Sequence, residues 1–372
     1  MKEKKNISRR TFLKTAAAGI GGATLALQGA GEAVAQKDKA PAKITPPGKV
    51  WRLKLQSSWT GIGISSQDEA VKLYCERVKK LSGGRIEMKN YDADVLLGIG
   101  ETFKGVASGV ADVAVTSSIY HRGIVPVAYY LWAVPFFPND HLEFMELWYQ
   151  ILGGKEIWRE AYAPHGVMHL TFECSDEWGT MVSTKPIRKF SDYKGLKVRA
   201  FGIWADWLVQ NGASIVTVPG GEIYMAIQTK IVDAAAFGSP DAWAGAKLYE
   251  VCKYFINPSI IPYDTCEVIM NLKTFNEMPP DLQEVMLSAS RIHNLDVTSR
   301  TIMTDGKARK TLADKGMETI FMPEDELKKA EEWCWNKFLS AKGKDPYIDR
   351  LIEVYAKARE MHKAYYGPKK LL

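Results

Sequence analysis

The segment KPIRKFSDYKGLKVRAFGIWADWLVQNGASIVTVPGGEIYMAIQ, Lys185–Gln228, carries the pattern that decides the fold. Short apolar stretches are each followed by a stretch with helical spacing, and Gly212 stands where the first helix should end, as glycine does after a last helical turn. Strands and helices are predicted in alternation at 195–199, 203–210, 215–218 and 221–230. This strand–helix–strand–helix order predicts an α/β protein with parallel sheets flanked by helices.

The same alternation continues on both sides of this segment. Trp51, Leu53 and Leu55 alternate with polar residues, which predicts a strand. The next helix is expected to be capped by Ser65 or Ser66. Further strands are predicted at 85–91, 112–116, 166–172 and 268–271, and further helices at 100–109, from 139 or 140 to 148, and at 281–300, 324–340 and 346–365.

The first 35 residues have the features of an export signal. Basic residues crowd positions 2–10, a mildly apolar stretch follows at 15–30, and Ala33-Val34-Ala35 offers small residues to a signal peptidase. The motif SRRTFLK at Ser8–Lys14 is a twin-arginine signal. The apolar stretch is too short and too rich in glycine to span a bilayer, which needs about 20 apolar residues. We therefore expect export to the periplasm by the twin-arginine route and a chain that is not embedded in the membrane.

The composition of the mature chain limits its partners. The chain has 49 Lys and Arg and 43 Asp and Glu. The signal holds six of the basic and two of the acidic residues, which leaves a net charge of about +2. Such a balance gives no argument for binding nucleic acid or membranes. Residues 36–49 are rich in Lys and Pro and predict a flexible tether. The remaining length favours two domains.

Motifs of enzymes are missing from the sequence. It has no GxGxxG after a strand, no GxxxxGK[ST], no HExxH and no GxSxG. None of its five cysteines forms a CxxC pair. His165 and His169 have the spacing of metal ligands on a helix, but Gly166 and its apolar neighbours favour a loop and a strand there. The sequence thus predicts neither catalytic residues nor a cofactor.

Arg199 is the strongest candidate for binding a ligand. It ends the predicted strand at 195–199, and α/β sheets bind ligands at the carboxyl ends of their strands. Its guanidinium suits bidentate capture of a carboxylate. From the residues alone, a surface salt bridge is an equal alternative. Aromatic residues of the surrounding sequence each favour core packing, but together they indicate a lined pocket; they are Trp178, Trp204, Trp207, Phe237 and Trp243.

Four segments stand in a characteristic order: Leu81–Arg85 (LSGGR), Val106–Asp112 (VASGVAD), Lys185–Arg199, and Gly221–Gln228 (GEIYMAIQ) with Val232-Asp233-Ala234 shortly after. This order resembles the DctP-type extracytoplasmic binding proteins of TRAP transporters, and the resemblance extends over residues 51–350. It implies a two-lobed, periplasmic-binding-protein-like α/β fold, with the ligand in the cleft between the lobes and closure by a hinge.

The resemblance also implies where the lobes lie. We expect lobe I at 50–171 plus 264–300 and lobe II at 172–263 plus 301–350, with a C-terminal helix and tail at 351–372. The closed form is expected to deliver a small organic carboxylate to the membrane subunits of a TRAP transporter.

The family's carboxylate-binding arginine falls on Arg199. Members that bind sialic acid or C4-dicarboxylates carry a second arginine, where this chain has Gly179; a single guanidinium favours a monocarboxylate. The chain looks closest to the branch that binds 2-oxo acids and lactate, in which some members use a metal ion held by a Gln, a Glu-Trp pair and a later Glu. Here those positions hold Trp178, Ala236-Phe237, and Ile261 or Pro262.

These replacements remove the ligating oxygens, so no metal is expected, with Asp264 as a weak alternative ligand. They also favour a larger or aromatic acid. The candidate ligand-binding residues are Arg199, Trp178, Phe237, Ala236, Tyr120 and Ser117. Two alternatives remain open: a periplasmic protein of the same fold that senses carboxylates, and a periplasmic enzyme on this fold.

Overall fold

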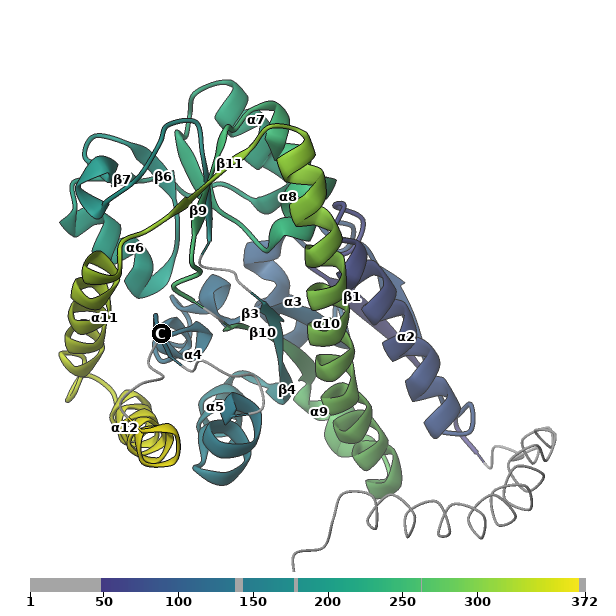
Figure 1. The fold of residues 1–372 in the computed structure, drawn as a ribbon. Coiled ribbons are helices and arrows are strands. Elements are labelled where there is room, and N and C mark those ends of the chain that lie inside the picture. Colours follow the sequence, from purple (N-terminus) through teal and green to yellow (C-terminus); the bar gives the residue numbers. More distant parts are fainter. Residues whose placement is uncertain (1–47, 138–142, 177–179, 262, 368–372) are drawn as a thin grey trace, which may run out of the picture. The chain divides into compact units, whose positions relative to one another are not determined.

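The computed structural model describes residues 48–137, 143–176, 180–261 and 263–367. The predicted signal at 1–35, most of the tether and the tail after residue 367 lie outside these ranges. The strands form two sheets (Figure 1). The first has the order β2-β1-β3-β10-β4, with strands β1 (Trp51–Ser57), β2 (Ile86–Tyr91), β3 (Val113–Ser117), β4 (Val167–Asp176) and β10 (Tyr263–Asn271).

The first strand of the chain, β1, is the strand that the alternation of apolar and polar residues predicted. Leu53 and Leu55 of β1 are buried whereas Arg52 is exposed. Strand β1 pairs in parallel with β2 and β3. Helix α2 (Ser65–Leu81) lies against this sheet and ends before Gly83, whose φ of 63° is the left-handed conformation that glycine accepts readily.

The second sheet has the order β11-β9-β5-β8-β6-β7. Its strands are β5 (Met181–Ser183), β6 (Lys197–Arg199), β7 (Ser214–Ile215), β8 (Ala234–Ala236), β9 (Tyr254–Asn257) and β11 (Glu318–Phe321). Strand β6 is parallel to β7 and β8, as the deciding segment predicted. The strand predicted at 215–218 is short, because after Ile215 the chain turns toward a single 3₁₀ turn and helix α7 (Ile223–Gln228).

The expectation of parallel sheets is met only in part, because both sheets are mixed. Strand β10 runs antiparallel to β3 and β4, and β5 runs antiparallel to β8 and β9. Parallel neighbours need a crossover, usually a helix. Here β4 and β10 lie in the first sheet, whereas β5, which follows β4 in the chain, and β9, which precedes β10, lie in the second. Strands that enter a sheet in this way can run in the opposite direction.

Helix α10 (Pro280–Asp314) packs along both halves of the structure (Figure 1). Its first half buries Leu282 and Met286 in the core of the first sheet, and its second half buries Leu312 in a core of the second. It continues well past the predicted end at residue 300. The remaining helices are α3 (Thr102–Ala107), α4 (Ala128–Trp132), α5 (Gly154–Tyr162), α6 (Gly202–Gln210), α8 (Pro240–Gly245), α9 (Leu272–Glu277), α11 (Glu324–Leu339) and α12 (Pro346–Tyr366).

Two further observations concern the type and the length of the helices. The helix predicted to end at Trp148 is described as a π-helix, Glu143–Ile151, and its predicted start at 139 or 140 lies outside the described residues. Among the helices that the structure describes, we find none long and apolar enough to cross a bilayer.

Candidate functional site

Arg199 is a buried residue at the carboxyl end of β6. Its side chain is 1% exposed, so it is not part of a surface salt bridge. The Nε atom donates to the carbonyl oxygen of Val218 at 3.1 Å, and Nη1 donates to the carbonyl oxygen of Ala236 on β8. The backbone of neighbouring segments thereby holds the guanidinium at the strand ends.

Aromatic rings complete the surroundings of the guanidinium. Its central carbon lies 4.5 Å from the ring centre of Phe201 and 5.6 Å from that of Phe237, distances at which a cation is attracted to a ring face. Burial lowers the pKa of Arg199, whereas the hydrogen-bonded hydroxyl of Tyr120 raises it. Arginine stays protonated under such shifts. A buried guanidinium at strand ends is a suitable partner for an anionic ligand.

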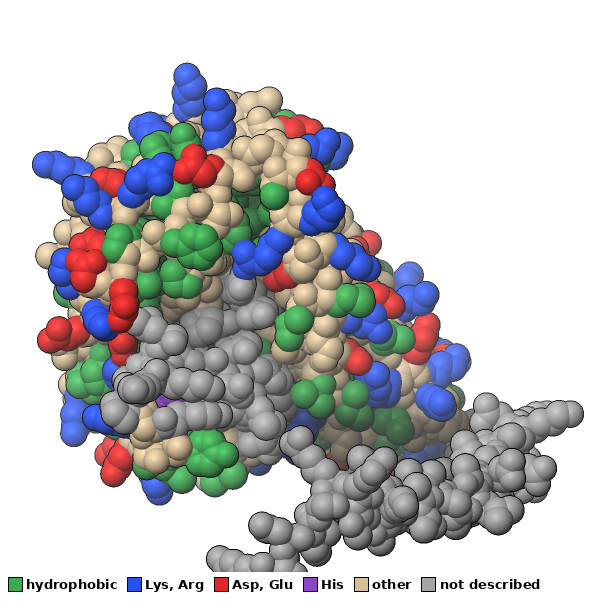
Figure 2. Space-filling view, viewed as in Figure 1, with side chains coloured by type: hydrophobic (Ala, Val, Ile, Leu, Met, Phe, Trp, Pro, Cys, Tyr) green, Lys and Arg blue, Asp and Glu red, His purple; other side chains and the backbone are tan. Residues whose placement is uncertain are grey.

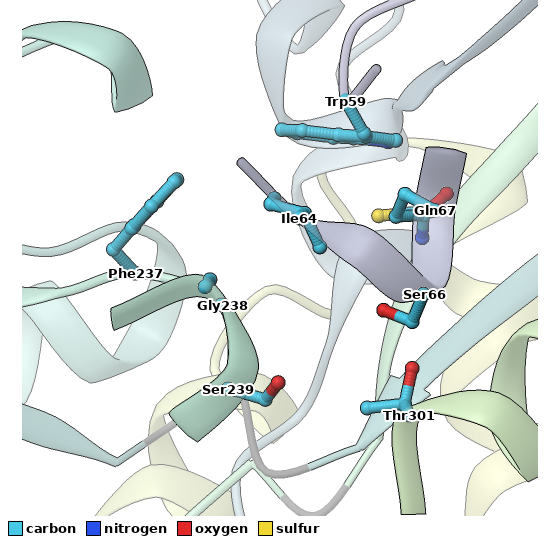
Figure 3. A pocket seen from close by; sticks show the side chains of 10 residues that line it. Trp59, Ile64, Ser66, Gln67, Phe237, Gly238, Ser239 and Thr301 are labelled. Atoms are coloured by element: carbon cyan, nitrogen blue, oxygen red, sulfur yellow. The ribbon is translucent and has the colours of Figure 1, made fainter. Parts of the chain in front are cut away.

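A series of rings leads from Arg199 toward a cavity. The ring of Phe201 lies 5.9 Å from that of Tyr120, and Tyr120 lies 6.1 Å from Trp59. Trp59 follows the end of β1 and borders a cavity of about 30 Å³ (Figure 3). The lining residues include Trp59, Ile64, Gln67, Phe237, Ser239 and Thr301.

Elements attached to both sheets contribute to this cavity. Trp59 and Gln67 come from the end of β1 and the start of α2, whereas Phe237 and Ser239 lie between β8 and α8. In Figure 3, Phe237 faces the cavity from the side opposite Gln67 and Thr301, with Trp59 across its rim. A ligand in this position would touch both halves of the structure.

Unsatisfied polar atoms gather at the cavity. Trp59 Nε1, Gln67 Oε1 and Thr301 Oγ1 are buried and have no hydrogen-bond partner among the described residues. Ser117 Oγ is also buried without a partner in the described chain, at the end of β3, where Ser117 pairs with the cavity residue Cys266. Most buried polar groups in proteins are hydrogen-bonded, so four such atoms in one region indicate groups available to a ligand.

The structure brings together four of the predicted contact residues. Phe237 and Tyr120 lie beside Arg199, and Ala236 contributes its carbonyl oxygen there. Ser117 supplies one of the unsatisfied hydroxyls. Trp178 and Pro262, at two of the expected metal positions, and Gly179, at the place of the second arginine, lie outside the described residues. Asp264 lies in β10 opposite Ser175, and its side chain is not among those described.

Three other tryptophans do not contact the Arg199 guanidinium in the described structure. Trp204 and Trp207 pack against Phe190, at ring distances of 5.7 and 5.4 Å, and Trp207 also meets Trp333 of α11. Trp243 donates its indole N–H to the carbonyl oxygen of Phe237. These three tryptophans therefore belong to the packed core, as was expected for each ring taken alone.

Sequence reasoning missed several residues of the site. Trp59 and Phe201 each follow a strand end by two residues, so the rule that selected Arg199 also points to them. Gln67 and Thr301 carry no such signal, because helices α2 and α10 bring them to the cavity through tertiary packing.

The histidine pair does not form a helical metal site. His165 ends a 3₁₀ turn and is exposed, whereas His169 is buried within β4, as the loop-and-strand interpretation predicted. Among the side chains that the structure describes, no group of three or more His, Cys, Asp and Glu could hold a metal ion.

A buried arginine at strand ends, next to the Phe237 ring of a cavity that both α/β halves line, is the arrangement expected of a bilobal solute-binding protein. The model of the family named bacterial extracellular solute-binding protein, family 7 (DctP), matches residues 63–337, and the chain belongs to this family. The model of the twin-arginine signal matches residues 6–26. The chain is therefore a solute-binding protein exported to the periplasm by the twin-arginine route.

Similar proteins extend over most of the chain. A monocarboxylate 2-oxoacid-binding periplasmic protein of Nostoc sp. is 25% identical over 356 residues, which covers 95% of this chain and 94% of that one. A TRAP transporter solute-binding protein from Bordetella bronchiseptica, with copurified calcium and picolinate, superposes with a TM-score of 0.76 at 20% identity, covering 86% and 94%. One from Pseudoalteromonas atlantica, with sodium and pyruvate, gives 0.74 at 21%, covering 85% and 96%. These structures share the two-lobed fold.

Proposed function

We propose that this chain captures a small organic monocarboxylate in the periplasm and delivers it to the membrane subunits of a TRAP transporter. The observation that carries the proposal is the burial of the Arg199 guanidinium between two backbone carbonyls and two rings. The Nostoc relative is named for 2-oxo acids, and the Pseudoalteromonas neighbour holds pyruvate, which supports the same class of ligand.

The surroundings of Arg199 favour one carboxylate on an apolar or aromatic body. Phe237 and Trp59 supply ring surface at the cavity. The unsatisfied polar atoms there are an indole N–H, hydroxyls and an amide oxygen, all neutral groups. A second carboxylate would lose its hydration without gaining a cation, at a cost of several kcal/mol, so we expect dicarboxylates such as succinate to bind poorly.

The described residues do not fit a metal ion at the place that the family branch uses. Ala236 and Phe237 have no side-chain oxygen, and the carbonyl oxygen of Ala236 accepts from Arg199. A site for Na⁺ or Ca²⁺ needs several oxygen ligands. We therefore propose that the ligand is held by Arg199 and neutral groups without an ion.

Delivery requires the two halves to open and close around the ligand. We propose lobes at 50–171 plus 264–300 and at 172–263 plus 301–350, with the closed form docking on the membrane subunits. The two sheets and the shared cavity support this division. Binding of the ligand would favour the closed form by contacting both lobes at once.

The test of this proposal is the replacement of Arg199. The mature protein is first screened by thermal shift against carboxylic acids, where a ligand at 100 times its Kd should add about 2.7 kcal/mol to the free energy of unfolding. Arg199→Ala should then weaken binding of the best acid by at least about tenfold, since losing a buried charge pair costs about 2–5 kcal/mol. Arg199→Lys should recover only part of the loss, because the planar fork is missing.

The matched control is Arg188→Ala. Arg188 is largely exposed and pairs with Glu318 on the surface, and such pairs contribute little to stability. Calorimetry should give the control the affinity of the wild type. A folded Arg199→Ala protein that binds as tightly as Arg188→Ala would refute the role of Arg199.

A further inference from the structure

Gln67 has a half-satisfied amide group at the edge of the cavity. Its side chain is 3% exposed and lines the cavity. The Nε2 atom donates to Glu173 Oε1 at 2.5 Å, whereas Oε1 has no hydrogen-bond partner among the described residues. The amide therefore has one end bound to the protein and one acceptor unused.

The partners of Gln67 fix which end of the amide remains unused. Glu173 is fully buried, and its other oxygen lies 2.8 Å from His293 Nε2. The ring of His293 is stacked on Tyr74 at 4.8 Å, and the Tyr74 hydroxyl is bonded to Ser290. A carboxylate only accepts hydrogen bonds. The amide N–H₂ must then face Glu173, and flipping it would bring two acceptors together.

A second buried glutamine shows what a structural amide looks like in this fold. Gln56 is 1% exposed and borders a different cavity. Its Nε2 donates to the Asp92 carbonyl oxygen at 2.9 Å, and its Oε1 accepts from Leu96 N at 3.0 Å. Both ends of Gln56 are satisfied by the chain. A buried acceptor without a partner is unfavourable, so Gln67 differs from Gln56 in a way that a hydrogen bond from a ligand would correct.

We infer that Gln67 Oε1 accepts a hydrogen bond from a hydroxyl or N–H group on the end of the ligand remote from its carboxylate. This inference rests on the proposed function, in which Arg199 holds the carboxylate. Phe237 connects the two places, since it lies beside the guanidinium and also lines the cavity opposite Gln67 (Figure 3). The unsatisfied hydroxyl of Thr301 lines the same cavity and can serve the same group.

The buried carboxylate behind Gln67 also limits what the remote group can be. Glu173 accepts from the Gln67 amide that would receive the ligand. An anionic group at this end of the ligand would face Gln67 Oε1, which is itself an acceptor, with the Glu173 carboxylate next to it. A hydroxyl or N–H group donates to Oε1 without that conflict. The ligand class is thus an organic acid with one carboxylate and a remote neutral donor.

Calorimetry with isosteric acids tests this inference. One series compares ω-hydroxy acids with alkyl acids that have a methyl group in place of the hydroxyl, across several chain lengths. A second pair compares 3-(4-hydroxyphenyl)propanoate with 3-(4-methylphenyl)propanoate. In the wild type, at least one hydroxyl member should bind at least tenfold more tightly than its methyl isostere, because a site built for a donor rejects the analogue without it.

The variant Gln67→Leu should abolish that preference while leaving the affinity for the methyl isosteres within about twofold, since the lost contact is specific to the donor. Gln67→Met is the second variant should Gln67→Leu not fold. Gln283→Leu is the control, because its amide bonds to the carbonyl oxygens of Phe275 and Met278 away from the cavity. It should keep the preference of the wild type.

The outcomes separate this inference from the proposed function. Wild-type protein that binds both members of every pair without preference contradicts the inference alone, as does a preference that persists in both Gln67 variants. Wild-type protein that binds none of the acids, or an Arg199→Ala protein that binds them normally, contradicts the proposed function as well.

Discussion

At the scale of single residues, His169 shows how the fold holds a neutral histidine. It is fully buried in β4, its Nδ1 lies 3.1 Å from the Tyr149 hydroxyl, and its ring is stacked on Trp158 at 4.5 Å. Its Nε2 lies 3.7 Å from Glu267. Burial, and then the charges of Arg159 and His121, hold the pKa of His169 well below its ordinary value of 6.5.

This shift predicts the direction of a pH effect on stability. Above pH 6.5 the imidazole is neutral in both states. As the pH falls below 6.5, the unfolded chain takes up a proton that the folded chain refuses, so the free energy of unfolding falls by up to about 1.4 kcal/mol per pH unit for this group. The loss continues until the pH reaches the lowered pKa of the folded state.

The check is urea unfolding between pH 7.5 and 5, with His169→Gln and, as the control, His165→Gln. His165 is exposed, so its replacement should leave the wild-type pH dependence unchanged. His169→Gln should have a shallower pH dependence than both, whatever its absolute stability. Parallel curves for all three proteins would contradict a role of His169 in the acid sensitivity.

Part of the candidate site could be predicted residue by residue. Arg199 followed from its place at the end of a strand, and Phe237 from its place at a position of the family pattern, beside Arg199. Gln67 and Thr301 could not, because their roles depend on which helices pack around the cavity. A sequence pattern shows which face of a helix is apolar, but it does not show which buried polar atom lacks a partner.

At the scale of elements, the start of helix α2 differs from its prediction. Ser65 and Ser66 do not cap the helix with their own side chains, and the capping position falls on Ile64. The carboxylate of Asp241 on α8 takes this role: it accepts from Ser66 N at 3.1 Å and from Ser65 Oγ at 3.0 Å. Helix α2 packs on the first sheet and α8 in a core of the second, so this cap joins the two halves.

Removal of this cap should affect both stability and binding. Loss of an N-terminal cap costs about 0.5–2 kcal/mol, so Asp241→Ala should lower the free energy of unfolding by that amount. Because the cap exists only while the two halves are together, we also expect weaker binding of every ligand by a similar factor. Thermal unfolding and calorimetry with several acids measure the two effects.

Asp345→Ala is the matched control for the cap. Asp345 caps α12 within its own segment, through Tyr347 N at 2.8 Å and Ile348 N at 3.2 Å. The Asp345→Ala protein should show a similar loss in the free energy of unfolding but bind ligands as tightly as the wild type. Equal affinities in Asp241→Ala and Asp345→Ala would show that the contact between α2 and α8 does not contribute to closure.

Helices and strands could be predicted where the spacing of apolar residues within the element determines them. Strand β1 and helix α6 follow the expected spacing closely. The strand predicted at 268–271 is part of β10, but its antiparallel direction was missed, because strand direction depends on crossings between sheets, which no local spacing records. Strand β5, with three residues, was not predicted. Helix α10 is longer than predicted because its second half packs against α8, and this contact arises only in the tertiary fold.

At the scale of the whole molecule, the fold class followed from alternation, and the two-lobed arrangement followed from the family resemblance. The near-neutral charge of the mature chain also has a structural counterpart. Figure 2 shows Lys and Arg interspersed with Asp and Glu over the visible face. Surface pairs such as Lys328–Glu324 and Arg350–Glu160 illustrate this mixing. The visible surface of the described residues therefore offers no patch of one charge, which is consistent with the proposal that the buried Arg199 binds the anion.

The most direct test of the central claim is calorimetry of the mature protein with pyruvate, a branched 2-oxo acid, a phenyl-substituted acid and succinate, each with and without a chelator. An apolar body gains about 25 cal/mol for each Å² buried, so affinity should rise from pyruvate to the larger monocarboxylates. Succinate should bind weakest, because its second carboxylate finds no cation. The chelator should change nothing. Succinate binding most tightly, or binding that disappears with the chelator, would contradict capture of a monocarboxylate by Arg199 and neutral groups alone.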